Sequence, residues 1–371
     1  MRLPSHCTRL LRGASGAACL LFGAAGALGA QGDRDSTIAV KFGAFVDGYY
    51  AWDFNRPRTL DRAYTTQPAR HNEFNVNLAY VEAVLSGERV RGRLALQAGT
   101  SVQANYLGEP AVGSYSGGNL ARHLQEAVAG IRLSPTLWLD GGIYLSHIGS
   151  ESWISRDNLT YTRSLIADYS PYYQSGVKLT WQATPALTAQ LNVVNGWQVI
   201  SESNEDKAIG GRVDWAATPR VTLSAYNLIG SETPDSAARQ LRIFHGASVK
   251  FVPIDRVTLV GTFDVGAQDL GDETGRWYGT SLIARVQATP AVALVGRVER
   301  YDDPDQVLIV TGVSEPFAAT GGSIGVDVSP APRVLWRTEL RALSGGDELF
   351  PARDGRKTTN AFLVSSLALT F

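Results

Sequence analysis

Charged side chains recur at every second position within segments whose other residues are mainly apolar. Arg337, Glu339 and Arg341 follow this spacing near the end of the chain, and Arg297 and Glu299 repeat it earlier. Successive side chains of a β-strand point to opposite faces, so each segment would gather its charges on one face. Rows of guanidinium and carboxylate groups that face water attract ions and filter them by charge. The chemistry that these residues suggest is therefore the selection of ions and solutes.

Catalytic chemistry is the competing interpretation. Ser146 is adjacent to His147, but adjacent residues of a strand point to opposite faces and cannot act together. The sequence carries no HExxH zinc motif, phosphate-binding loop or dinucleotide fingerprint. We therefore expect no enzyme activity, no catalytic residue, no metal site and no cofactor. An outer-membrane lipase remains the less favoured alternative, for which the candidate histidines would be His71, His123, His147 and His245.

A repeated proline-containing segment sets the spacing of the strands. The run Trp181-Gln182-Ala183-Thr184-Pro185 recurs in similar form at 215–219 and at 286–290, and an alternating run such as 187–193 follows the proline. Proline has no amide proton to give to a sheet, so interior strands exclude it. We place every proline after residue 30 in a connection between strands. Each repeat is interpreted as a strand, a tight turn and a second strand.

These patterns predict an all-β protein: a transmembrane, antiparallel, up-and-down β-barrel of about sixteen strands, with fourteen to eighteen left open. Short turns alternate along the chain with longer connections, of which the longest are 53–72, 103–123, 149–171, 302–316 and 345–358. The strands are placed near 38–52, 73–85, 90–102, 124–133, 137–148, 172–183, 187–198, 207–217, 221–229, 239–251, 257–268, 276–288, 291–301, 317–328, 333–344 and 359–371.

Aromatic residues gather near both ends of the predicted strands. Since amphipathic rings prefer the depth of lipid headgroups, we expect two aromatic girdles around the barrel. Trp138, Trp181, Trp215, Phe251 and Trp336 would form the girdle beside the proline turns, although the alternation puts Trp138 on the inner face. Tyr49, Tyr50, Trp52, Trp197, Tyr226 and Tyr301 would form the other.

The first thirty residues have the pattern of a secretory signal peptide. Arg2, Arg9 and Arg12 precede a short apolar stretch rich in Gly and Ala, and a cleavage site is expected after Gly29 or Ala30. Residues 1–30 are thus predicted to be removed, leaving 31–371 as a single outer-membrane barrel domain. Both cysteines of the chain lie in the leader. The exported barrel would contain no disulfide bond.

The last strand carries a pattern of its own. Leu367, Leu369 and Phe371 alternate on one face and look like the C-terminal signal of bacterial outer-membrane proteins, which the barrel-assembly machinery binds. We expect export to the outer membrane, where lipid and lipopolysaccharide would surround the apolar outer face. The formal net charge of −1 gives no basic excess for a nucleic-acid partner.

One cluster of short motifs also resembles a known family. The segments 164–165, 170–176, 194–197 and 206–208, which include Pro171-Tyr172-Tyr173 and Asn195-Gly196-Trp197, look like those of the OmpL-like beta-barrel porins. The resemblance implies a general diffusion channel or a weakly selective one. The solute and the choice between a monomer and a homotrimer stay open.

The alternation of side chains assigns nineteen charged residues to the lumen of a water-filled pore for small hydrophilic solutes. Cations outnumber acids among them by five, which favours a mild preference for anions. Alternatively, neighbouring charges cancel, as the pairs Arg297/Glu299 and Arg337/Glu339 suggest. The predicted lining is Lys41, Asp47, Arg91, Arg93, Glu126, Arg132, Asp140, Lys178, Arg212, Asp214, Arg242, Lys250, Asp264, Arg285, Arg297, Glu299, Arg337, Glu339 and Arg341.

The third long connection, 149–171, is predicted to fold inward and narrow the pore, as the third loop does in classical porins. Its charged residues would form the constriction; they are Glu151, Arg156, Asp157, Arg163 and Asp168. A solvated outer loop is the alternative for this segment. For the whole chain, the alternative to a channel is a structural or adhesive barrel whose loops are the working surface.

Overall fold

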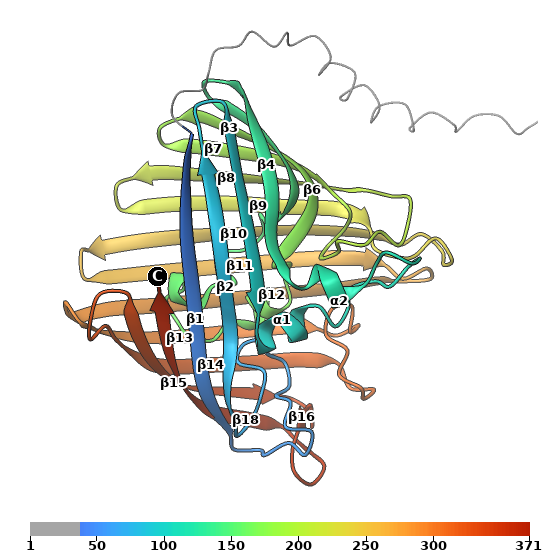
Figure 1. Cartoon of the computed structure of the whole chain (residues 1–371). Helices are drawn as coiled ribbons and strands as arrows, with labels where there is room; N and C mark the ends of the chain where they lie inside the picture. Colours follow the sequence, from blue (N-terminus) through green and yellow to red (C-terminus); the bar gives the residue numbers. More distant parts are fainter. Residues whose placement is uncertain (1–37) are drawn as a thin grey trace, which may run out of the picture. The chain divides into compact units, whose positions relative to one another are not determined.

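The computed structural model describes residues 38–371, so the predicted signal peptide, residues 1–30, lies outside the described residues. Residues 38–371 form a closed barrel of sixteen antiparallel strands (Figure 1), which confirms the predicted fold class. The strands are β1 (Ala39–Asp53), β2 (Phe74–Ser86), β3 (Val90–Ala98), β4 (Leu124–Ser134), β5 (Leu137–Leu145), β6 (Tyr173–Thr184), β7 (Leu187–Val194), β8 (Ala208–Thr218), β9 (Val221–Ser231), β10 (Leu241–Ile254), β11 (Val257–Asp269), β12 (Thr274–Thr289), β13 (Val292–Asp303), β14 (Phe317–Val328), β15 (Val334–Gly345) and β18 (Thr359–Thr370).

Each barrel strand pairs with its neighbours in sequence, and β1 closes the wall against β18. Short turns join the strands at one end of the barrel, here called the turn end, and long connections join them at the other, the loop end. A separate two-stranded ladder, β16 (Phe350–Pro351) with β17 (Arg356–Lys357), lies in the last long connection. Closure leaves no unpaired sheet edge, the condition for a β-structure that spans a membrane.

The alternation of side chains explains why these segments form a barrel with a polar interior. In β13, Arg297 and Glu299 are buried on one face, whereas Leu294 and Val298 are more than half exposed on the other. In β15, Trp336 has the same outward orientation as the exposed leucines. A soluble sandwich would hide its apolar face, so this distribution is typical of a lipid-facing wall.

The repeated Thr-Pro segment has a specific structural role at the turn end. The strand register shifts by one residue at Gln182/Thr184, and the equivalent shift recurs at 216/218 and at 287/289. In each copy the Thr hydroxyl accepts a hydrogen bond from the amide two residues later, at 3.2 Å for Thr184 and Ala186. The repeat is therefore a bulged turn in which Thr holds the chain and Pro prevents further pairing.

Three predicted strands end earlier than expected at the loop end. The strand predicted over 90–102 stops at Ala98, because Gly99 has φ +140° and lies so close to β2 that a Cβ would approach the Asn77 carbonyl oxygen to 2.3 Å. The helix α1 (Thr100–Asn105) follows directly. The strands predicted over 137–148 and 187–198 likewise stop short, at residues 145 and 194.

The prediction that every proline lies in a connection was wrong at two positions. Pro253 lies within β10, at a register shift between Phe251 and Ile254 where the ladder does not need its amide. Pro351 lies in β16, outside the barrel wall. Both positions agree with the rule that proline occupies bulges and edge strands rather than ladder interiors.

The helices of residues 38–371 are short, and none is long and apolar enough to cross a membrane. Besides α1, they are α2 (Gly118–Ala121), the 3-10 turn η2 (Ser155–Asp157) and α3 (Leu165–Asp168). The elements η2 and α3 lie in the connection 146–172 between β5 and β6, here called the inserted loop.

Candidate functional site

The inserted loop crosses the barrel interior. It leaves the wall between β5 and β6 and is bound by side chains of β13, β15 and β1. In the circular order of the strands, β13 is eight positions from β5 and thus on the opposite side of the sixteen-stranded wall. The inserted loop therefore runs inward from β5 and β6 to the opposite wall, along the path that the sequence predicted for residues 149–171.

Arg337 of β15 makes the most extensive attachment between the wall and the inserted loop. Its Nη1 donates to the Ser155 carbonyl oxygen at 2.7 Å, and its Nη2 donates to the carbonyls of Asn158 at 3.0 Å and Leu159 at 2.7 Å. Its Nε donates to Asp327 of β14 at 2.9 Å. The guanidinium is 1% exposed, so its charge is neutralised by Asp327 and its N–H groups are used by the loop.

A second attachment centres on Thr162 of the loop. Its amide and hydroxyl both donate to the Glu339 carboxylate, each at 2.8 Å, and its carbonyl accepts from Arg297 at 2.6 Å. Glu299 accepts the Leu165 amide at 2.7 Å, at the start of α3, and is paired with Arg341 at 2.8 Å. The loop backbone is thereby held by alternating wall acids and bases.

Further contacts fix the two ends of the crossing. Asp47 of β1 accepts the Ser155 hydroxyl at 2.7 Å. Arg212 of β8 donates to the carbonyls of His147 at 2.9 Å and Gly149 at 2.8 Å, where the loop leaves β5. The buried Asp47 and the partly accessible Arg212 therefore attach the inserted loop to β1 and β8.

The predicted constriction residues divide into two groups. Arg156 and Asp157 are accessible and lie 3.4 Å apart, with Arg156 also donating to Thr370 of β18. Glu151 binds Ser164, and Asp168 accepts from Thr66 at 2.6 Å. Neither carboxylate forms a salt bridge with a wall arginine within residues 38–371, although Arg297 lies near Glu151 and Arg341 near Asp168.

Arg163 is another buried residue of the predicted constriction. It is 0% exposed, and its guanidinium carbon lies 5.7 Å from the Tyr172 ring centroid. Its nitrogens have no hydrogen-bond partner among residues 38–371. The arginine is thus held by aromatic contact and by the nearby loop acids rather than by direct pairing.

Burial favours the protonated form of the two loop acids. Loss of water raises the pKa of Glu151 and the pKa of Asp168, and nearby arginines oppose the rise. The folded protein then holds protons that the unfolded chain has released, so stability falls as pH rises above the ordinary carboxyl pKa of about 4. We expect the double variant Glu151→Gln, Asp168→Asn to lose less stability than the wild type over that rise, measured by urea unfolding at several pH values. Equal pH profiles for the two proteins would contradict this.

Burial also divides the nineteen charged residues that the sequence assigned to the lumen. Ten are buried, mostly beneath the inserted loop, and they comprise Asp47, Glu126, Asp140, Arg242, Asp264, Arg297, Glu299, Arg337, Glu339 and Arg341. Nine remain accessible, and eight of these are cations: Lys41, Arg91, Arg93, Arg132, Lys178, Arg212, Lys250 and Arg285, with Asp214 as the single acid.

The suggested charge pairs are present in one case and absent in the other. Arg297 lies 3.1 Å from Glu299, as expected. Arg337 pairs with Asp327 and not with Glu339, because Asp327 is directly opposite it on the neighbouring strand. Sequence reasoning missed Asp327, and also Glu82, which pairs with Arg93 at 2.7 Å. Both have the inward parity of their strands, which could have revealed them.

A family model matches residues 39–371, almost the whole described barrel, and its description is "Putative beta-barrel porin-2, OmpL-like". This chain belongs to the OmpL-like porin family. The match confirms the resemblance noted in the sequence, and the porin is a protein of the bacterial outer membrane. No curated protein sequence matches it significantly.

Solved structures with the same fold are distant in sequence from this porin. The outer-membrane channel DcaP of Acinetobacter baumannii superposes with a TM-score of 0.61 at 11% identity, over 90% of this chain and 97% of that one. An anion-selective porin from Comamonas acidovorans gives 0.58 at 10% identity, over 90% and 100%. The trimer form of OmpT from Vibrio cholerae gives 0.58 at 8% identity, over the same shares. At these identities the likeness shows the fold.

The porin's aromatic residues are distributed differently from the two expected girdles. Trp181, Trp215, Phe251 and Trp336 are exposed on the outer wall at the turn end, as predicted. Trp138 lies inside, with the Arg91 guanidinium carbon 4.4 Å from its ring centroid. At the loop end, four of the predicted girdle residues are instead buried in the interior: Tyr49, Trp197, Tyr226 and Tyr301.

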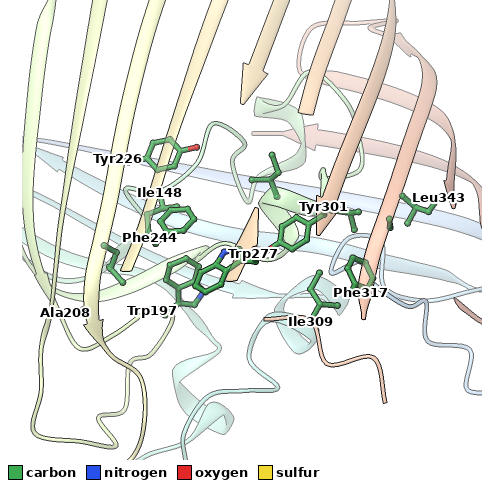
Figure 2. Packing of buried hydrophobic residues seen from close by; sticks show 14 of the residues in the cluster. Ile148, Trp197, Ala208, Tyr226, Phe244, Trp277, Tyr301, Ile309, Phe317 and Leu343 are labelled. Carbon is green, nitrogen blue, oxygen red and sulfur yellow. The ribbon is translucent and has the colours of Figure 1, made fainter. Parts of the chain in front are cut away.

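Three of these inner rings, Trp197, Tyr226 and Tyr301, belong to a packed core within the loop end of the porin (Figure 2), whereas Tyr49 lies in a separate cluster. Trp197 packs edge-on against Phe244, with ring centroids 4.9 Å apart, and against Trp277 at 6.4 Å. Tyr301 contacts Phe317 further along the wall, at 6.3 Å. Tyr226 and Tyr301 have the inward parity of β9 and β13, whereas Trp197 lies beyond the end of β7, in the following connection. Nearness to a strand end therefore did not suffice to put these rings at the lipid interface.

Proposed function

We propose that this porin is a water-filled channel for the passive diffusion of small hydrophilic solutes, and that it prefers anions. The observation that carries the preference is the division by burial: the accessible part of the predicted lining holds eight cations and one acid. Glu82 adds a second partly accessible acid. Among the buried acids, three bind the inserted loop and two pair with wall arginines; they are Asp47, Glu299 and Glu339, and Glu126 and Asp140, respectively.

Four of the accessible cations supply most of the free positive charge. Lys41, Arg132, Lys178 and Lys250 form no salt bridge within the described part of the chain, whereas Arg91 and Arg285 pair with buried acids. Cations distributed around a pore wall lower the energy of a passing anion and raise that of a cation. This arrangement supports the proposal over complete cancellation between neighbouring charges.

Reversal potentials test the preference directly. In a KCl gradient across a planar bilayer, the wild-type porin is expected to give a reversal potential whose sign is that of a channel more permeable to chloride than to potassium. The triple variant Lys41→Gln, Lys178→Gln, Lys250→Gln is expected to move that potential toward zero, because three unpaired charges leave the wall. Lys357→Gln, in the hairpin outside the barrel wall, is the matched control. A wild-type reversal potential whose sign shows higher permeability to potassium than to chloride would refute the preference for anions.

Assembly and partners form a second part of the proposal. The outward residues of β18, Leu367, Leu369 and Phe371, are exposed and suit recognition by the barrel-assembly machinery. The exposed apolar wall suits contact with outer-membrane lipid and lipopolysaccharide. The trimer form of a structurally similar protein supports a homotrimer. The leader, residues 1–30, would be cleaved on export, and residues 31–371 would be the mature barrel domain.

The geometry of the candidate catalytic residues favours a channel over an enzyme. Both ring nitrogens of His147 are occupied, one by Gln174 at 2.8 Å and the other by the Asn227 carbonyl at 2.9 Å. The run 321–325 has G-x-S-x-G spacing around Ser323, but it lies within β14 and not at the strand-to-helix turn of a nucleophile elbow. Bilayer conductance without phospholipid hydrolysis is the expected result, and it also separates a channel from an adhesive barrel.

A further inference from the structure

A cavity of about 360 Å³ lies at the loop end, beside α3. Residues from several separate connections meet there, together with the wall strand β10. The polar groups that bear on its chemistry are Asp168, Glu232 and Arg242, and Trp197 supplies an apolar side. None of the contacts by which Arg337, Arg297 and Glu339 hold the inserted loop involves these residues.

Two carboxylates of the cavity are each satisfied on one oxygen only. Asp168 Oδ1 accepts from Thr66 and, at 3.1 Å, from the Tyr172 hydroxyl, whereas its Oδ2 has no partner although the residue is 7% exposed. Glu232 Oε2 accepts the Trp197 amide at 2.9 Å, whereas its Oε1 is buried without a partner. An unpaired buried carboxylate oxygen is costly, so each position calls for an N–H donor.

Arg242 brings a positive charge to the same cavity. Its Nε donates to Gln268 at 2.8 Å, and its guanidinium carbon lies 5.1 Å from the Trp197 ring centroid. No hydrogen bond of the described residues uses its Nη1 or Nη2. A guanidinium fixed at Nε and over an aromatic face presents its terminal amino groups as a planar fork that suits a carboxylate.

A further residue of the cavity lining, Gln198, is fixed in position by two hydrogen bonds. Gln198 accepts the Tyr172 amide at 2.6 Å and donates to the Asn105 carbonyl at 3.1 Å. These bonds connect the inserted loop to the ends of α1 and β7, so the cavity does not depend on a mobile side chain. Binding a small solute there would cost little ordering of the protein.

We infer that this cavity is a binding site for a small zwitterion that carries an ammonium group and a carboxylate, such as an α-amino acid. The ammonium would donate to Asp168 Oδ2 and Glu232 Oε1, and the carboxylate would accept from the fork of Arg242. A simple anion would meet two carboxylates, and a simple cation would meet the guanidinium; only a solute with both charges pairs all three groups. The inference builds on the proposed diffusion function, because a zwitterion bound at the loop end would be a solute of the channel.

Calorimetric titration of the refolded, detergent-solubilised porin with L-alanine tests the site. We expect saturable binding with a dissociation constant of about 1 mM or tighter. Methylammonium and acetate, which each carry half of the zwitterion, should bind at least about tenfold more weakly. Glycine betaine should also bind weakly, because its quaternary nitrogen has no N–H to donate. Absence of saturation with L-alanine, or equal affinity for either half, would overturn the inference.

Variants locate the binding within the chain. Glu232→Gln keeps the shape of the side chain and should weaken L-alanine binding about tenfold, since a charge-assisted hydrogen bond is lost. Arg242→Gln should do the same for the carboxylate. Glu205→Gln, an exposed residue of the neighbouring connection, is the matched control and should bind like the wild type. Wild-type affinity in both cavity variants would place the zwitterion elsewhere and refute the assignment.

Conductance of the same preparations in planar bilayers separates the two proposals. A conducting porin that does not bind L-alanine would refute the zwitterion site alone. A protein that binds L-alanine but does not conduct would refute the diffusion channel and keep the site. Conductance in Glu232→Gln and Arg242→Gln also shows that these variants have formed the barrel.

Discussion

Deleting residues 153–165 and joining the ends with a short Gly-Ser linker is expected to raise the single-channel conductance about threefold or more, because a sixteen-stranded wall alone encloses an aqueous channel. The deleted segment contains η2 and Thr162, the parts of the inserted loop that contact β13, β15 and β1. Without them, water and ions would fill the space that the loop now occupies. Planar-bilayer recordings at one salt concentration would measure the change.

The same deletion is expected to weaken anion preference. It uncovers wall residues whose charges balance, with three cations and three acids: Arg297, Arg337, Arg341, Asp47, Glu299 and Glu339. The reversal potential in a KCl gradient should therefore move toward zero while the conductance rises. Unchanged conductance after the deletion would show that the inserted loop does not limit the current.

Replacing Arg337 with Met is expected to lower the free energy of unfolding by about 3 kcal/mol, the sum for three backbone carbonyls that each lose a hydrogen bond worth about 1 kcal/mol. The carbonyls belong to Ser155, Asn158 and Leu159 of the inserted loop. Asp327 would keep Arg285 as a partner, which limits the penalty from its buried charge. Urea unfolding in detergent micelles or lipid vesicles would measure the difference.

Arg300→Met is the matched control for this substitution. Arg300 also belongs to the barrel wall and pairs with Asp302, but its side chain is 45% exposed. Exposed ion pairs contribute little, so the change should stay below about 1 kcal/mol. If Arg337→Met and Arg300→Met destabilised the barrel equally, the guanidinium of Arg337 would not be what holds the loop.

The barrel could be predicted from the sequence because its signals are local. Alternation along 333–343 is sufficient to assign the inner and outer faces, and the Thr-Pro repeat marks the tight turns. The early end of β3 was not predictable in this way, because it depends on how closely Gly99 approaches Asn77 of another strand. Tyr226 was misplaced because position along a strand was given more weight than parity, and Trp197 was misplaced because β7 ends at Val194, before this residue.

The candidate site was predictable in part. The sequence identified the inserted loop and the wall charges, but not which of them would contact one another. Arg337 pairs with Asp327 because the register of β14 and β15 sets the two residues directly opposite, and register between strands has no signature in either strand alone. The bonds from Arg337 to the inserted loop join residues about 180 positions apart. No local pattern carries such a contact.

The long sequence separation of those bonds has a consequence for the order of folding. Ser155 meets Asp47 of the first strand and Arg337 of β15, so its final contacts exist only after both ends of the chain have come together. Contacts between residues far apart in sequence form late, because closing the intervening chain costs entropy. We therefore expect docking of the segment 155–162 to be a late step, which follows closure of the wall between β1 and β18. Before that step the closed barrel would have a wider, unobstructed lumen.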